Sequence, residues 1–253
     1  MGHHSTVEAG TVSVPYLRRV ALVALFVLLL VSLVGRTVFM LWEPPFDGTI
    51  RYDDIRELGS AYWPMNLYLG GPAYAVSWVA VAVFIVRLGR GRAGVLNLVG
   101  AFLVGLGGVV FALTITAEVL PFAYAADPAV LPEAQGRALF DVLNDRLDWV
   151  IPAIISSQLA IVAGMLLALV GALIARTMPR PLTIAALVYA VLFVALPLAQ
   201  FGRAVVIVDY LLQVALVAAI GWYGLRAVDR EARDTTPQAA DDRSTPHTES
   251  AVA

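Results

Sequence analysis

Long uninterrupted apolar stretches alternate with short polar segments along most of the chain, and this pattern predicts membrane-spanning helices. A helix needs about 20 apolar residues to cross a hydrocarbon core of about 30 Å, and a helix bonds its whole backbone internally, as lipid requires. Six stretches are long enough. They lie near 20–41, 66–87, 95–119, 150–174, 182–201 and 204–225. The sequence therefore predicts an all-α polytopic bundle of about six spans, forming one transmembrane domain over 18–226.

The two ends of the chain have a different composition. Residues 1–17 and 227–253 contain few large apolar side chains, so each is expected to be a disordered cytoplasmic tail. Two longer polar segments, between the first and second spans and between the third and fourth, each end in Trp with a nearby Pro: Trp63-Pro64, and Trp149 followed by Pro152. Because Trp prefers the headgroup level, each segment is expected to contain a short interfacial helix on the extracytoplasmic side.

Both interfacial helices have recognisable start signals. Asp54 and Glu57 have the spacing of a capping box, which would open a short helix through Ile55, Leu58 and Tyr62. Pro132 suits the first turn of a second, longer helix. The apolar face of that helix is predicted to consist of Leu139, Val142, Leu143, Leu147 and Val150.

The arginines predict the orientation of the bundle. With the N-terminus inside, the cytoplasmic segments hold Arg18, Arg19, Arg87, Arg90, Arg92, Arg176, Arg180, Arg226, Arg230 and Arg233. The opposite side holds Arg51, Arg56, Arg137, Arg146 and Arg203, in segments that are also rich in Asp and Glu. Cytoplasmic loops carry the excess of cationic residues, so both termini are predicted to be cytoplasmic in a plasma-membrane protein.

Composition excludes several classes of function. The chain is 60% hydrophobic and 14% charged, with a net charge of −2, so it has no basic surface for nucleic acid. There is no Cys, and His3, His4 and His247 all lie in the polar tails, so no span offers thiolate or imidazole to a metal, a haem or a proton relay. No cofactor is expected. All 17 cationic residues are Arg, which fits codon bias in a GC-rich bacterial genome.

Small residues recur at helical spacing in two spans, where they allow close backbone approach. The third span carries Ala101, Gly105, Gly108, Ala112 and Thr116; the fourth carries Ala153, Ser157, Ala160, Gly164, Ala168, Gly171 and Ala175. We expect these two spans to pack tightly, against each other or against a common neighbour. A homodimer interface is the alternative use of either stripe, and other membrane subunits are further possible partners beside the lipid bilayer.

Three charged residues fall within predicted spans: Arg36, Glu118 and Asp209. With 1.5 Å rise per residue, Arg36 lies about 9 Å and Asp209 about 8 Å from the outer ends of their spans, and Glu118 lies about one turn from its own. The neighbouring polar residues are Gln213, Gln158 and Arg203. Embedded charges usually pair and face the bundle interior, so the hypothesis is that Arg36 bridges to Glu118, Asp209 or both in a polar pocket open to the outside. A purely structural pair and a partner interface are the alternatives.

The first interpretation of function is a non-enzymatic accessory or sensory membrane component with its specificity on the extracytoplasmic side. The second is a transporter or permease subunit that uses the polar pocket for a small solute or ion; a membrane enzyme comes third. The six-span, ends-inside layout is broadly similar to the membrane subunits of export-type ATP-driven transporters. Those subunits carry a longer cytoplasmic coupling segment, whereas the inner loops here have about eight residues or fewer, so no functional residue is carried over.

Overall fold

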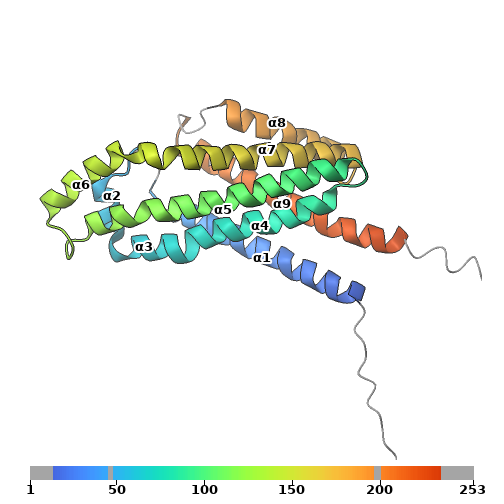
Figure 1. The fold of residues 1–253 in the computed structure, drawn as a ribbon, viewed down its shortest axis with the longest axis horizontal. Coiled ribbons are helices and arrows are strands. Elements are labelled where there is room, and N and C mark those ends of the chain that lie inside the picture. Colours follow the sequence, from blue (N-terminus) through green and yellow to red (C-terminus); the bar gives the residue numbers. More distant parts are fainter. Residues whose placement is uncertain (1–13, 45–47, 197–200, 235–253) are drawn as a thin grey trace, which may run out of the picture.

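A computed structural model describes residues 14–44, 48–196 and 201–234. Within these ranges every regular element is helical, which confirms the all-α prediction. The long helices run side by side as an elongated bundle, and two short helices cover one end of it (Figure 1).

The spans correspond to six long or intermediate helices. They are α1 (Val14–Trp42), α4 (Gly71–Leu88), α5 (Ala93–Ala126), α7 (Ile151–Ala175), α8 (Arg180–Ala195) and α9 (Arg203–Asp234). A continuous helical run leads into α4 through α2 (Tyr52–Leu58), the 3-10 turn η1 (Gly59–Ala61), α3 (Tyr62–Met65) and the π-helical turn η2 (Asn66–Gly70).

Five of these helical segments are long and apolar enough to cross a membrane, which is consistent with a membrane protein. The exception is α8, whose 16 residues span about 24 Å at 1.5 Å per residue, less than a core of about 30 Å. Part of its predicted range, 197–200, lies outside the described residues. The sixth crossing therefore stays a prediction.

Both predicted tails are shorter than expected within the described chain. The first helix already begins at Val14, and α9 continues through Asp234, so 14–17 and 227–234 are helical rather than disordered. The reason at the C-terminal end is local, because Arg, Glu and Ala after residue 226 are good helix formers even outside an apolar environment. The rest of the predicted tails, 1–13 and 235–253, lies outside the described residues.

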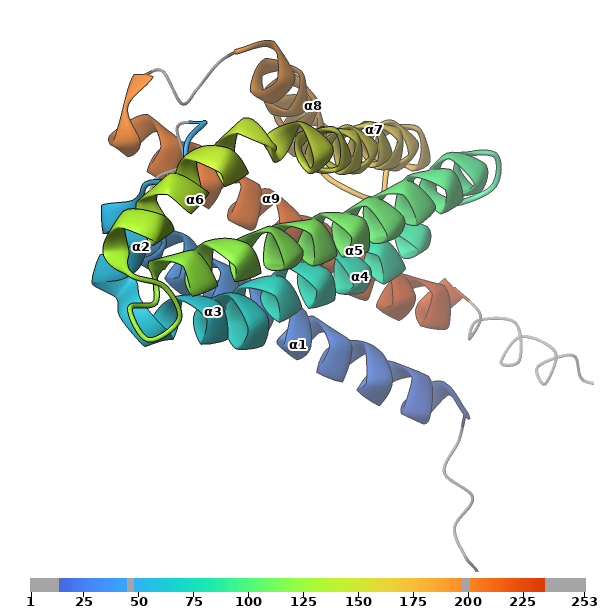
Figure 2. The same cartoon turned by 60° about the vertical axis from the view of Figure 1, so that its left-hand side comes forward.

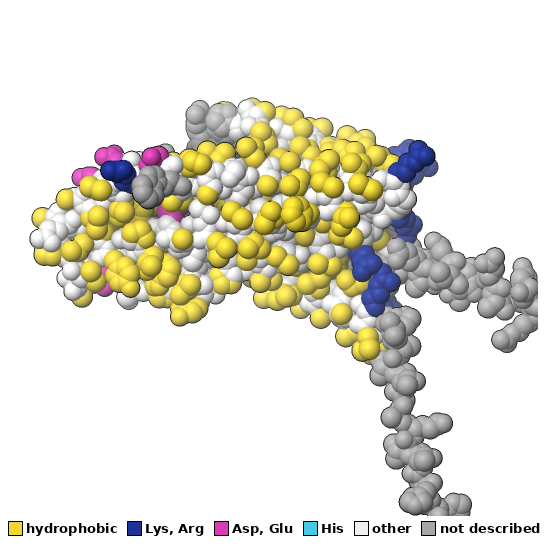
Figure 3. Space-filling view, in the orientation of Figure 1, with side chains coloured by type: hydrophobic (Ala, Val, Ile, Leu, Met, Phe, Trp, Pro, Cys, Tyr) yellow, Lys and Arg dark blue, Asp and Glu magenta, His cyan; other side chains and the backbone are white. Residues whose placement is uncertain are grey.

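The start of α1 and the end of α9 lie at the same end of the bundle (Figure 1). Arginine side chains gather at this end, which we call the basic end, and acidic side chains gather at the opposite end (Figure 3). The opposite end, which we call the capped end, is formed by α2, η1, α3, α6 (Glu133–Asp145) and the 3-10 turn η3 (Leu147–Trp149) (Figure 2).

An aromatic cluster joins the cap to the bundle. Phe140 of α6 lies with its ring centroid 5.1 Å from Tyr52 of α2 and 5.0 Å from Phe122 of α5, both in edge-to-face geometry. To reach this cluster, α5 continues to Ala126, beyond its predicted end at 119. Salt bridges from Arg137 to Asp53 and from Arg56 to Glu133 link the exposed sides of α2 and α6.

The predicted details of the two cap helices are partly wrong. The cap residue of α2 is Arg51, not Asp54, because burial of Tyr52 against Phe140 starts the helix earlier and leaves Asp54 in the first turn. Pro132 is itself the cap residue of α6. Val142 was predicted on the apolar face but is 54% exposed, since the buried face of this helix instead includes Phe140.

The two small-residue stripes are used differently. The fourth-span stripe does pack on α5: a Cβ built on Gly164 would lie 2.6 Å from the Gly100 carbonyl oxygen, so the two backbones are in contact. The third-span stripe, however, faces α4, where Gly108 lies against Trp78. A second row on α5 that includes Gly100 and Gly107 provides the contact with α7. Helix α5 thus packs closely on two neighbours at once.

Candidate functional site

Arg36 is the centre of the most unusual environment in the described chain. Its side chain is only 2% exposed, although it lies about 9 Å from the end of α1 at Trp42. Aromatic rings surround the guanidinium, whose carbon lies 4.4 Å from the Tyr74 ring centroid, 4.7 Å from that of Trp78 and 5.7 Å from that of Tyr210. A cation over aromatic faces gains about 0.5–2 kcal/mol per ring.

The guanidinium donates a hydrogen bond from Nη1 to the Ser77 hydroxyl at 3.2 Å. Among the described residues Arg36 forms no salt bridge with Glu118 or Asp209, so the predicted ion pair is wrong. The prediction relied on similar depths along the spans, but the helices turn these groups in different directions, and α4 and α9 present aromatic rings to Arg36 instead.

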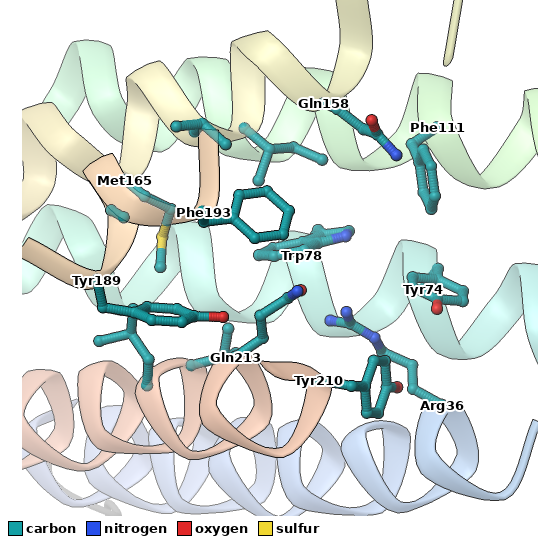
Figure 4. A pocket seen from close by; sticks show the side chains of 15 residues that line it. Arg36, Tyr74, Trp78, Phe111, Gln158, Met165, Tyr189, Phe193, Tyr210 and Gln213 are labelled. Carbon is teal, nitrogen blue, oxygen red and sulfur yellow. The ribbon is translucent and has the colours of Figure 1, made fainter. Parts of the chain in front are cut away.

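Arg36 forms part of the wall of a partly open cavity of about 230 Å³ between α1, α4, α5, α7, α8 and α9 (Figure 4). Arg36, Tyr74, Trp78, Tyr189, Tyr210 and Gln213 point into a shared space in this view (Figure 4). The rest of the described wall is mainly apolar and includes Phe111, Met165, Phe193 and Leu216. The exposed member of the wall is Gln158 on α7, which marks the mouth of the cavity.

Asp209 lies just behind this wall. Its Oδ1 accepts a hydrogen bond from the Tyr189 hydroxyl at 2.6 Å, and its Oδ2 accepts one from Gln213 Nε2 at 2.9 Å. The carboxylate thus orients two side chains that do line the cavity, and it joins α8 to α9. The predicted proximity of Gln213 to Asp209 is confirmed, because residues one turn apart share a helix face.

Glu118 lies at a separate place. It lines a groove of about 780 Å³ between α5 and the start of α7, together with Arg146 and apolar residues such as Phe122 and Leu147. Glu43, just after α1, is close enough to interact with it electrostatically, and burial together with the Glu118 charge raises the pKa of Glu43 to about 7. The predicted polar cluster is therefore two sites. Arg36, Gln158 and Gln213 share the cavity, with Asp209 behind it, and Glu118 is elsewhere.

Arg203 does not belong to the cavity wall. It is the first residue of α9 and its side chain is exposed. A charged residue at a helix end can reach water or lipid headgroups without entering the bundle. Its place in the predicted cluster is not supported.

The aromatic residues of the site were missed from the sequence. A signal was present, because Tyr74 and Trp78 are four residues apart in the middle of a predicted span, as are Tyr189 and Phe193. Such pairs lie on one helix face. Tyr and Trp are expected at the interface with headgroups. Their position in mid-span therefore indicated a surface inside the bundle at which their polar atoms can form hydrogen bonds.

The cavity has the composition of a binding site for a small molecule: a mostly apolar, aromatic wall with few polar groups. It holds Arg36, whose burial is costly unless a partner compensates the charge. The described residues contain no group of three or more His, Cys, Asp or Glu that could hold a metal ion.

Searches of protein-family models, of curated proteins and of solved structures find no match to this chain. The class of the protein therefore comes from its fold: it is an all-α protein with several apolar helices of membrane-spanning length.

Proposed function

We propose that this chain is a non-enzymatic multipass protein of the plasma membrane that binds a small solute in the Arg36 cavity, as an accessory or sensory component. One observation carries the proposal: a fully buried Arg36 lines a partly open cavity and has no carboxylate partner among the described residues. A cation that served only to fix helix register would be expected to have its counter-charge within the bundle.

The topology that we propose has six spans with both termini in the cytoplasm. The start of α1 and the end of α9 both lie at the basic end (Figure 1), and an even number of crossings returns the chain to its starting side. In this topology helix α8 supplies the additional crossing. The arginines at the basic end support a cytoplasmic assignment (Figure 3), so the capped end and the mouth at Gln158 would face outward.

A transporter or permease subunit is the second candidate, and the π-helical turn η2 favours it. This turn, Asn66–Gly70, leads directly into the segment of α4 that carries Tyr74 and Trp78. Single π-helical turns are frequent at functional sites, where they allow local rearrangement. Transport would require the cavity to open toward the basic end as well. A carrier would accumulate solute in proteoliposomes, whereas a sensor or accessory subunit would only bind it.

The absence of native Cys makes the proposal directly testable. Single-cysteine proteins Q158C and M165C place a thiol at the mouth and deeper in the wall, and V191C places one on an exposed apolar face of α8 as the control. A membrane-impermeant thiol reagent added outside intact cells is expected to label Q158C and, more slowly, M165C, but not V191C. Labelling of Q158C from the cytoplasmic side alone would overturn the outward-facing site, and no labelling from either side would overturn the accessible cavity.

A further inference from the structure

Some polar atoms around the cavity form hydrogen bonds and others have no partner in the described part of the chain. Arg36 Nε, Trp78 Nε1 and the Tyr210 hydroxyl are buried without a hydrogen-bond partner among the described residues. Buried polar groups in proteins are nearly always bonded, so three such atoms around one cavity indicate a missing partner. The two nitrogens can only donate, which means that the missing partner must be a hydrogen-bond acceptor.

The charge of the wall limits the ligand further. Among the wall residues that the structure describes, Arg36 alone has a formal charge at neutral pH. Asp209 is already bonded on both oxygens, by Tyr189 and Gln213, and is not a wall residue. A ligand with one negative charge would neutralise Arg36, whereas a doubly charged ligand would leave one buried charge uncompensated. This balance favours a carboxylate over a phosphate monoester.

The volume and the apolar wall define the rest of the molecule. An apolar cavity of about 150 Å³ is known to hold benzene, so about 230 Å³ accommodates a body somewhat larger than one ring. Phe111, Met165, Phe193 and Leu216 provide an apolar and aromatic surface for it. A molecule with two long acyl chains does not fit this volume.

We infer that the cavity binds a compact organic monoanion, a carboxylate on an aromatic or branched apolar body. Its carboxylate accepts hydrogen bonds from Arg36 and Trp78, and its body packs against the apolar part of the wall, which includes Phe111 and Phe193 (Figure 4). The planar guanidinium suits a carboxylate, and bonds between two charged groups are the strongest of their kind. This inference rests on the proposed binding function and names the chemical class of its ligand.

Three probes of nearly equal size test the charge requirement: benzoate, neutral benzamide and cationic benzylammonium. The full chain is purified in mild detergent, and its melting temperature is measured against the concentration of each probe. We expect benzoate to stabilise the protein with an apparent affinity at least about tenfold above that of benzamide, because a charge-assisted hydrogen bond replaces a neutral one. Benzylammonium is expected to give no stabilisation.

Substitutions then locate the binding. W78F keeps an aromatic ring over Arg36 but removes the Nε1 donor, and it is expected to weaken benzoate binding by about fivefold or more. Benzamide binding is expected to weaken by a smaller factor, because the bond to its neutral carbonyl is weaker. R36Q removes the charge and is expected to abolish the preference for benzoate. E118Q changes the carboxylate of the separate groove and serves as the control, with benzoate binding unchanged. W78F keeps the test decisive if R36Q does not fold.

The outcomes separate the inference from the proposed function. Preference for benzylammonium, equal stabilisation by all three probes, or benzoate binding that W78F leaves intact would overturn the monoanion. None of these results would affect the accessible cavity, which the labelling of Q158C tests independently. No stabilisation by any probe, with Q158C labelled from outside, would likewise reject the monoanion alone. No stabilisation together with an unlabelled Q158C would reject both.

Discussion

The contact between α5 and α7 gives a quantitative prediction. A Cβ added at Gly164 would lie 2.6 Å from the Gly100 carbonyl oxygen and 2.8 Å from Val104 Cγ2. Ordinary carbon contacts are about 3.5–4.0 Å, so the G164A protein must separate the two helices by up to about one ångström. The carbonyl oxygen belongs to the α5 backbone and cannot turn aside as a side chain could. Overpacking of this kind costs about 1–3 kcal/mol.

The expected result for G164A is a melting temperature about 2 to 12 °C lower than that of the unchanged protein, at about 2–4 °C per kcal/mol for a chain of this size. Thermal unfolding in mild detergent, followed by circular dichroism, measures it. G105A is the matched control on α5, because its Cβ would meet Ala82 Cβ at an ordinary 3.5 Å. Alanine is also the better helix former, so G105A should melt at the same temperature or above. A G164A protein as stable as G105A would refute the close-contact reasoning.

Three further predictions concern the cap, the link between α8 and α9, and pH. F140A should cost about 3–5 kcal/mol of stability, because it removes a fully buried ring. R137A removes exposed ion pairs and should cost far less. Equal melting temperatures of the two variants would contradict this ranking. Y189F should destabilise by about 1–3 kcal/mol, because Asp209 loses a donor; retention of the full melting temperature would argue against that bond. The raised pKa of Glu43 means that the folded chain binds a proton more tightly than the unfolded chain, so stability should fall as pH rises from about 5 to about 7. In E43Q this fall should become smaller, and a pH dependence unchanged by the substitution would exclude Glu43 as its source.

Much of the helical architecture followed from the sequence. Runs such as 95–119 contain too many apolar residues for any element other than a helix in lipid, and α5 does form there. Local signals were less reliable at element ends. Asp54 and Glu57 had the spacing of a capping box, but the contact of Tyr52 with Phe140, 88 residues away in sequence, set the start of α2.

The candidate site was likewise predictable from the sequence in one respect and not in another. The sequence by itself determined how far along their helices Arg36, Glu118 and Asp209 lie, because position along a helix axis follows from a constant rise of 1.5 Å per residue. The tertiary structure alone decided the direction in which each group points. Rotation of a helix about its own axis depends on which small residues allow close contact with which neighbour, and these contacts surround Arg36 with rings while turning Glu118 into a separate groove.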